Sequence, residues 1–206
     1  MIVEQLPVGA MQTNCYVAGC ERTKTGVVID PGDEADRIMA AVAKHGLTIQ
    51  SVLLTHAHFD HIFACAGVVA ATKAPLAMHK QDLPLLKAGG GAALWGLPTP
   101  AYKEPERWLN EGDKITFGDY AFEVFFTPGH TPGHVCFYEP AAGVVFDGDV
   151  LFAGGIGRTD FPGGSYEALL DSISHKLMVL PDETIVYSGH GPATTIGRER
   201  ASNPFL

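Results

Sequence analysis

The densest chemistry in the sequence lies in one short segment, Thr55–His61, which holds three histidines and one aspartate. Residues two apart in an extended chain project to the same side, so His56 and His58 can grip one ion together. Asp60 follows on that side and His61 turns away as a helix begins, which places these two to serve a neighbouring ion. This alternation after an apolar run predicts a metal site rather than a surface loop with chance histidines.

Three further segments can complete a ligand set, because each follows a strand-like run. They are Thr127–His134, a double turn with two histidines; Phe146–Asp149, with two aspartates; and Ser188–Pro192, with one histidine. Proline and glycine restrict the backbone of the double turn, which aims an imidazole with little loss of entropy. Ligands of open α/β sheets bind beyond the carboxyl ends of strands, so these segments favour one shared site over unrelated loops.

Strand-like runs predominate early and late in the chain, and helical patterns lie between them, which predicts an α/β fold of sheets covered by helices. The predicted strands are Ile2–Val8, Cys15–Ala18, Val27–Ile29, Val52–Leu54, Phe122–Phe126, Val135–Tyr138, Val144–Phe146 and Thr184–Tyr187. The segment Gly89–Pro105 is expected to be an irregular surface loop, and its position would allow it to cover a site.

Three helices are predicted from apolar residues at helical spacing. The first is capped by Asp33 and ends at Gly46, and its apolar positions are Ile38, Met39, Val42 and Ala43. The second begins near Asp60 and buries Phe63, Ala66 and Val69. The third begins at Ser165 and uses Leu169, Ile173 and Leu177.

Composition excludes several classes of protein. Of 206 residues, 46% are hydrophobic, which rules out intrinsic disorder, and 24 glycines with 14 prolines disfavour a fibrous or all-helical chain. A net charge of −9 argues against a protein that coats nucleic acid or an anionic membrane, so neither is expected as a partner.

The chain begins with no basic region followed by an apolar stretch, and no uncharged run reaches the length of a membrane span. Its four cysteines are scattered and form no short metal-binding pair. We expect them to be reduced, mostly buried thiols of a cytoplasmic protein.

The His-x-His-x-Asp-His motif at His56–His61, followed by a distant His, Asp and His, resembles the metallo-β-lactamase superfamily. The resemblance spans His56 to His190. It implies an αββα sandwich in which two mixed β-sheets are flanked by helices, with the site at one edge. It also implies that residues 1–206 form a single domain of this fold.

The same resemblance implies two sets of metal ligands: His56, His58 and His130 for one ion, and Asp60, His61 and His190 for the other. Asp149 is expected to bridge the ions, and Asp60 and Asp149 to be the catalytic carboxylates. His134 is expected to orient a neighbour by a hydrogen bond. Asp147 is not expected to be a ligand. His45, His79 and His175 lie outside every cluster and are expected to have surface or capping roles.

Two divalent ions, two carboxylates and one hydroxide leave a single positive charge, which would attract an anionic substrate. Water shared by such ions loses its proton at a pKa of about 7 and becomes a nucleophile. The ions also polarise a carbonyl, so no serine or cysteine nucleophile is required. Zinc is the first expectation for both positions, and iron and manganese also suit mixed histidine and carboxylate ligands.

Within the superfamily, Thr127–Cys136 and Gly148–Phe152 resemble the hydroxyacylglutathione hydrolases, or glyoxalase II enzymes. This resemblance implies hydrolysis of the thioester S-D-lactoylglutathione by the bridging hydroxide, with Arg158 binding the anionic glutathione part. An ion pair between Arg158 and Asp160 is the competing interpretation of that arginine. We expect no C-terminal helical glutathione-binding domain like that of the full-length enzymes, because the chain resembles their compact single-domain bacterial relatives.

Other functions stay open, among them hydrolysis of lactones or phosphoesters within the superfamily. Gly157–Phe161 and Ile196–Leu206 also resemble the persulfide dioxygenases, which hold a single iron at the counterparts of His56, His130 and Asp149 and oxidise glutathione persulfide. His134 stands where those enzymes commonly have a smaller residue, which favours hydrolysis. The third function is a non-catalytic, metal-dependent binding module. The sequence does not determine the oligomeric state.

Overall fold

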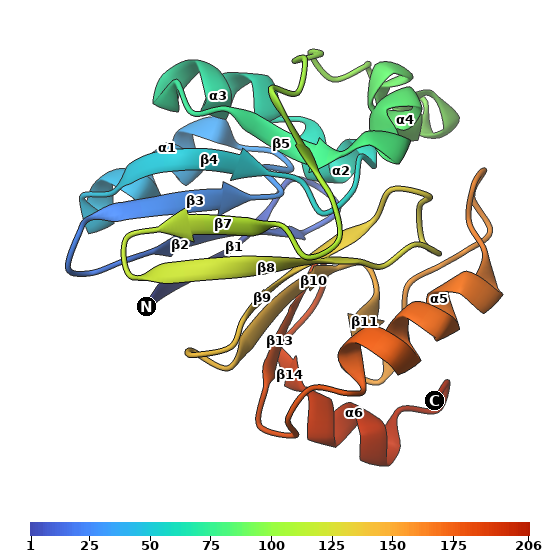
Figure 1. Ribbon diagram of the computed structural model, residues 1–206. Helices are drawn as coiled ribbons and strands as arrows, with labels where there is room; N and C mark the ends of the chain where they lie inside the picture. The colour runs from blue at the N-terminus through green and yellow to red at the C-terminus, as the bar shows by residue number, and fades with distance from the viewer.

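The computed structural model describes residues 1–206 and contains two six-stranded sheets (Figure 1). The first sheet is built from the N-terminal strands. Its strands lie in chain order: β1 (Ile2–Val8), β2 (Thr13–Gly19), β3 (Thr25–Ile29), β4 (Thr48–Leu53), β5 (Leu76–His79) and β6 (Arg107–Leu109). The pairs among β1, β2 and β3 are antiparallel, whereas β3 to β6 are parallel, so the sheet is mixed.

The second sheet has the order β14-β13-β10-β9-β8-β7. Its strands are β7 (Lys114–Phe117), β8 (Tyr120–Phe126), β9 (Val135–Glu139), β10 (Val144–Gly148), β13 (Ile185–Ser188) and β14 (Thr194–Thr195). Only β10 and β13 pair in parallel. A separate ribbon joins β11 (Leu151–Phe152) to β12 (Gly155–Ile156).

Helices cover the outer face of each sheet (Figure 1). The first sheet carries α1 (Ala35–His45), α2 (Phe59–Ile62), α3 (Cys65–Thr72), η1 (Lys80–Asp82), α4 (Leu83–Lys87) and η2 (Gly89–Trp95). The second sheet carries α5 (Tyr166–Ser172), η3 (Ile173–Leu177) and α6 (Ile196–Ser202). This helix–sheet–sheet–helix order confirms the predicted αββα sandwich.

The sheets are held together by an apolar layer between them, and two further layers lie under the helices. Phe122 occupies the central layer, where its ring centroid lies 4.8 Å from that of Phe117 and 5.3 Å from that of Phe146. All seven residues of β2 are buried, including the polar Thr13 and Asn14. All four cysteines are unpaired and buried, as predicted.

The predicted third helix is confirmed. The Ser165 side chain accepts a hydrogen bond from the backbone N–H of Ala168, and Leu169, Ile173 and Leu177 are fully buried. The first helix ends at Gly46 as predicted, in the left-handed conformation with φ 65°. Its predicted cap is wrong, because Asp33 binds the N–H of Glu34 and the helix begins one residue beyond Glu34.

The prediction of one continuous helix near Asp60 is also wrong. The chain forms two helices, α2 and α3, because the N–H of Ala64 donates to the carbonyl of Pro31 instead of to a helical partner. Val69 is buried as predicted, but Phe63 and Ala66 are only partly buried. The short α2 leaves the ligand segment free to follow the edge of the sheet.

The segment Gly89–Pro105 is more regular than predicted, because it begins with the 3₁₀ helix η2. Gly90 and Gly91 inside η2 have φ of 66° and 83°, which glycine adopts without strain.

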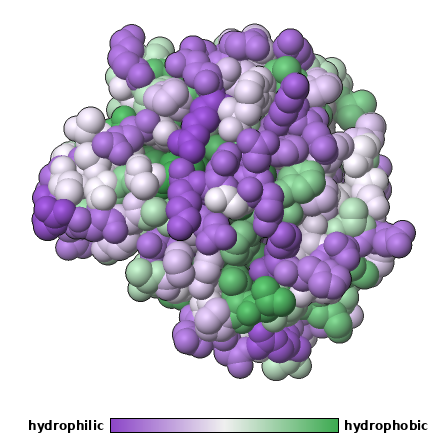
Figure 2. Space-filling model, in the orientation of Figure 1, coloured by the Kyte–Doolittle hydropathy of each residue, from purple (hydrophilic) through white to green (hydrophobic).

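The face in Figure 2 is mainly hydrophilic, with smaller hydrophobic areas between the polar side chains. No helix has the length and apolar character needed to span a bilayer.

Replacing Phe122 by alanine should lower the free energy of unfolding by about 3–5 kcal/mol, because the change leaves a cavity between the sheets. The matched control is Phe205→Ala, at an exposed position, for which we expect a change within about 0.5 kcal/mol. Denaturant unfolding of both variants at equal metal loading measures the difference. Equal losses would show that the central layer does not hold the sheets together.

Candidate metal centre

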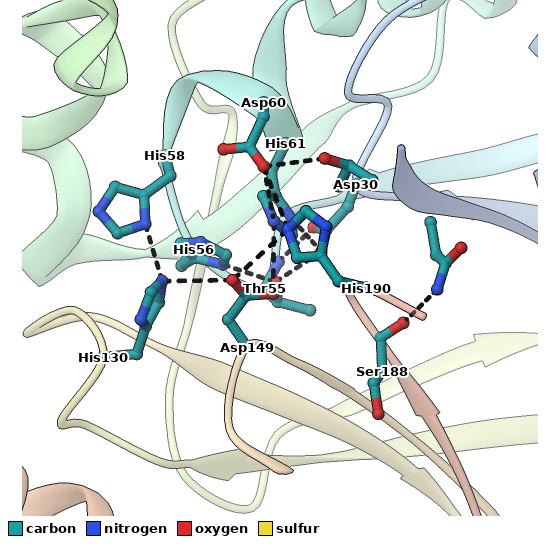
Figure 3. A network of polar contacts seen from close by, with 12 residues as sticks. Asp30, Thr55, His56, His58, Asp60, His61, His130, Asp149, Ser188 and His190 are labelled. Carbon is teal, nitrogen blue, oxygen red and sulfur yellow. Dashed lines mark hydrogen bonds and ion pairs between the residues drawn. The ribbon is translucent and has the colours of Figure 1, made fainter. Parts of the chain in front are cut away.

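The seven predicted ligands come from four segments that meet at one edge of the sandwich (Figure 3). His56 and His58 lie between β4 and α2, and Asp60 and His61 lie on α2. The other three follow separate strands of the second sheet: His130 after β8, Asp149 after β10 and His190 after β13. The structure therefore brings together every residue that the sequence predicts as a ligand.

Two sets of donor atoms lie side by side in this site. In the first, the ligand atoms of His56, His58 and His130 lie within 4.8 Å of one another, and all three residues are buried. In the second, Asp60, His61 and His190 meet the same limit. Each set has the number and type of donors that a protein offers to one first-row divalent ion.

Asp149 lies between the two sets (Figure 3). Its Oδ2 is 3.6 Å from Nε2 of His130, a member of the first set. Its Oδ1 is 3.5 Å from Nε2 of His61, a member of the second. Gly189 permits this approach, because a Cβ at that position would lie 2.2 Å from Asp149 Oδ1. A single carboxylate is thus within reach of both positions.

Three buried atoms of the site have no hydrogen-bond partner: Nε2 of His56, Nε2 of His61 and Oδ1 of Asp149. A buried polar atom without a partner costs free energy and is rare in folded proteins. All three atoms belong to the predicted ligand set, and a cation among them would give each a partner. The residues present therefore fit a metal centre.

The pKa values show how the histidines of the site divide. Burial, together with the neighbouring His130 and His61, lowers the pKa of His58 to about 3, so this imidazole is neutral at pH 7. Burial also lowers the pKa of His61, but the carboxylates of Asp60, Asp149 and Asp30 outweigh it and raise the value to about 10. The carboxylates thus favour positive charge at their centre, which a divalent cation supplies.

Asp30 was missed by the sequence analysis, and it holds both histidine sets in place. Its Oδ2 lies 2.9 Å from Nδ1 of His61 and accepts a hydrogen bond from the Thr55 hydroxyl. That hydroxyl oxygen lies 3.0 Å from Nδ1 of His56. Both imidazoles therefore direct Nε2 into the site. The available signal was its position directly after β3, at the same sheet edge as the histidine motif.

Asp82, also missed, ties two ligand segments together. Its fully buried carboxylate accepts hydrogen bonds from the N–H of Ala57, the hydroxyl of Thr131 and the N–H of Gly133. Ala57 lies between two ligands of the first segment, and Thr131 and Gly133 lie within the double turn Thr127–His134. No spacing in the sequence links Asp82 to either segment, because the contacts depend on how β5 is packed.

His134 has the contact expected of it, since its Nε2 accepts a hydrogen bond from the N–H of Asp149 at 3.2 Å. Asp147 is fully buried and accepts from the N–H of Leu151, and it belongs to neither donor set. The three remaining histidines lie outside the site. His45 contacts Glu4, His79 caps η1, and His175 contacts Asp171.

A cavity of about 390 Å³ opens from the metal centre. Its lining includes His58, Asp60, His130, Asp149 and His190, with apolar side chains contributed by α4 and η2. Arg158 also lines it. Its expected ion pair with Asp160 is present, and its role in substrate binding stays a prediction. It pairs with Asp160 through two contacts of 2.8 Å, while its guanidinium lies 3.8 Å above the centre of the Phe161 ring.

Residues 8–190 match the family model of the metallo-beta-lactamase superfamily. The chain belongs to this superfamily. A hydroxyacylglutathione hydrolase, GloC of Haemophilus influenzae, is 42% identical over 100% of this chain and 98% of its own length. The superfamily membership agrees with a metal-binding hydrolase, and the His/Asp clusters of the structure lie where such a centre requires them.

Two solved structures are similarly close. The BLEG-1 B3 metallo-beta-lactamase has a TM-score of 0.94 and 43% identity, covering 100% of this chain and 99% of that one. TTHA1623 in a di-iron-bound form has a TM-score of 0.90 and 45% identity, covering 99% and 100%. The fold is therefore shared with differently named proteins of the superfamily, one of them solved in a di-iron-bound form.

Replacing His58 by alanine removes one nitrogen donor from the first set and should cost about one bound ion per chain. His175→Ala is the matched control, because that exposed imidazole contacts only Asp171 on its own helical segment. Elemental analysis after dialysis compares both variants with the unmodified protein. The assignment is wrong if His58→Ala keeps its full metal content, or if His175→Ala loses as much.

Proposed function

We propose that this protein is a dinuclear metal-dependent thioester hydrolase, with S-D-lactoylglutathione as its first expected substrate. The observation that carries the proposal is the position of Asp149 between two complete donor sets, within 3.7 Å of nitrogens from both. The relative named hydroxyacylglutathione hydrolase supports the choice of substrate. Water adds to the thioester carbonyl, the C–S bond breaks, and a carboxylate and a free thiol are released.

Divalent ions at these positions would activate water at neutral pH and polarise the substrate carbonyl. The chain's own groups hold the geometry of this site. The Thr13 hydroxyl donates to Oδ2 of Asp60 at 2.8 Å, and His190 Nε2 lies 3.2 Å from the same oxygen. The Asp60 carboxylate is therefore held in one orientation at the wall of the cavity.

Arg158 is the positively charged side chain proposed to receive the anionic end of the substrate. It lines the cavity, and its backbone carbonyl lies 2.7 Å from Nδ1 of His130, which ties its position to the metal centre. Since Asp160 already pairs with this guanidinium, a substrate carboxylate has to compete with that side chain. Because both side chains are exposed, solvent screens this ion pair and it contributes little.

The second donor set favours hydrolysis over the alternative of a mononuclear iron dioxygenase. A single iron would need only His56, His130 and Asp149, yet Nε2 of His61 is also buried and without a partner. Nothing in the one-metal alternative uses that atom. A non-catalytic binding module is disfavoured because the donor sets adjoin an open cavity of substrate size.

The test is an assay of the metal-loaded protein with S-D-lactoylglutathione, in which the released thiol is measured. We expect thiol release without oxygen uptake. Asp149→Asn should lower kcat by more than about 100-fold, because it removes the carboxylate shared by the two sets. Asp171→Asn, at an exposed position that contacts only His175, is the matched control and should keep its rate.

Three outcomes contradict the proposal. Oxygen uptake with glutathione persulfide and no thioester cleavage would support the dioxygenase. Cleavage of a β-lactam in preference to the thioester would align the chain with the solved structure that carries that name. Binding of thioesters without turnover would support the non-catalytic module.

A further inference from the structure

We propose that the cavity selects thioesters whose acyl group is apolar and longer than lactoyl, and that Leu94 and Trp95 form its acyl-binding wall. This inference rests on the proposed thioester hydrolysis. It assigns the two ends of the substrate to two different parts of the cavity, one charged and one apolar.

The position of the wall is set by Gly90 of η2. A Cβ on this residue would lie 2.3 Å from the backbone nitrogen of Phe59 and 2.7 Å from the carbonyl oxygen of Ala57. The backbone of η2 therefore rests directly against the ligand segment, an approach that only glycine allows. Leu94 and Trp95 lie at the end of the same short element, which places them in the lining of the cavity beside the metal centre.

The wall is apolar and exposed. Leu94 is 71% exposed and Trp95 48%, although both line the cavity. The Trp95 ring lies 6.1 Å from that of Phe59, and Met11, 43% exposed, lines the same space. Large apolar side chains gathered around a concave site typically mark a surface that a ligand covers. An acyl chain bound here would remove these side chains from water.

Charge assigns the other end of the substrate to a different element. Arg158 is the only lysine or arginine in the cavity lining, and it lies in the loop between β12 and α5, beside His130. This loop belongs to the second-sheet side of the sandwich, whereas η2 belongs to the first-sheet side (Figure 1). The anionic thiol part is therefore expected near Arg158, which leaves the η2 side to the acyl part.

The contacts available to the two ends of the substrate indicate which end provides selectivity. Arg158 is already paired with Asp160, so an anionic group gains little by replacing that partner. Burying methylene groups against Leu94 and Trp95 is opposed by no such competition. The hydroxyl of a lactoyl group would also meet an apolar wall. Selection thus acts on the length and polarity of the acyl group.

The experiment compares kcat/KM of the metal-loaded protein for the S-lactoyl, S-butanoyl and S-hexanoyl thioesters of glutathione. We expect kcat/KM to rise about tenfold from butanoyl to hexanoyl, as two methylenes become buried. Leu94→Ser and Trp95→Ala should each bring this ratio toward one. Val179→Ser, at an exposed apolar position outside the cavity, is the matched control and should keep the ratio of the unmodified protein.

The outcomes separate this inference from the function on which it rests. If none of the three thioesters is cleaved, the proposed hydrolase itself is wrong. If S-lactoylglutathione is cleaved as fast as the hexanoyl compound or faster, the hydrolase stands and the acyl wall is overturned. The acyl wall is also overturned if Leu94→Ser and Trp95→Ala both keep the hexanoyl-to-butanoyl ratio of kcat/KM of the unmodified protein, with the control unchanged.

Discussion

The need for positive charge among buried carboxylates governs the arrangement of this molecule. Asp30, Asp60 and Asp149 surround His61 in a region with little access to water, and their oxygens all act on one imidazole. Like charges so close together are tolerated only when a cation or a proton compensates them. A divalent ion is the compensation for which the remaining ligand atoms are already oriented.

The sandwich satisfies this requirement through the ends of its strands. Four ligand segments follow strands β4, β8, β10 and β13. Buried hydrogen bonds accepted by the carboxylates of Asp30 and Asp82 join segments that are distant in sequence. The apolar layers fix the strands, and the carboxylates fix the segments relative to one another. The ligands are therefore positioned by groups that do not themselves bind metal in the proposed scheme.

The ligand set could be predicted from the sequence because its chemistry is local. The spacing of His56, His58 and Asp60 predicts a metal site, and the apolar run before them predicts the strand. Asp82 could not be predicted, because an isolated aspartate acquires such a role only through tertiary contacts. Asp30 offered a single signal, its position directly after β3. The long strands were predictable because their apolar patterns are also local. The break between α2 and α3 was not, because it depends on a hydrogen bond to the distant Pro31.

The structure of Gly89–Trp95 also depends on tertiary contacts that the local sequence does not reveal. Its glycines suggest an irregular loop, and only the close contact of Gly90 with Phe59 explains why they are needed. Through the contact of Gly90 with Phe59, this connecting segment becomes part of the cavity wall. A backbone requirement of this kind depends on the neighbouring segment, which no local pattern records.

The central claim is that two ions lie side by side and share Asp149. Anomalous X-ray scattering from crystals of the metal-loaded protein, recorded at the absorption edge of the metal, locates the ions directly. The account predicts two peaks, one among His56, His58 and His130 and the other among Asp60, His61 and His190. A single peak at full metal loading, with the second donor set empty, would contradict it.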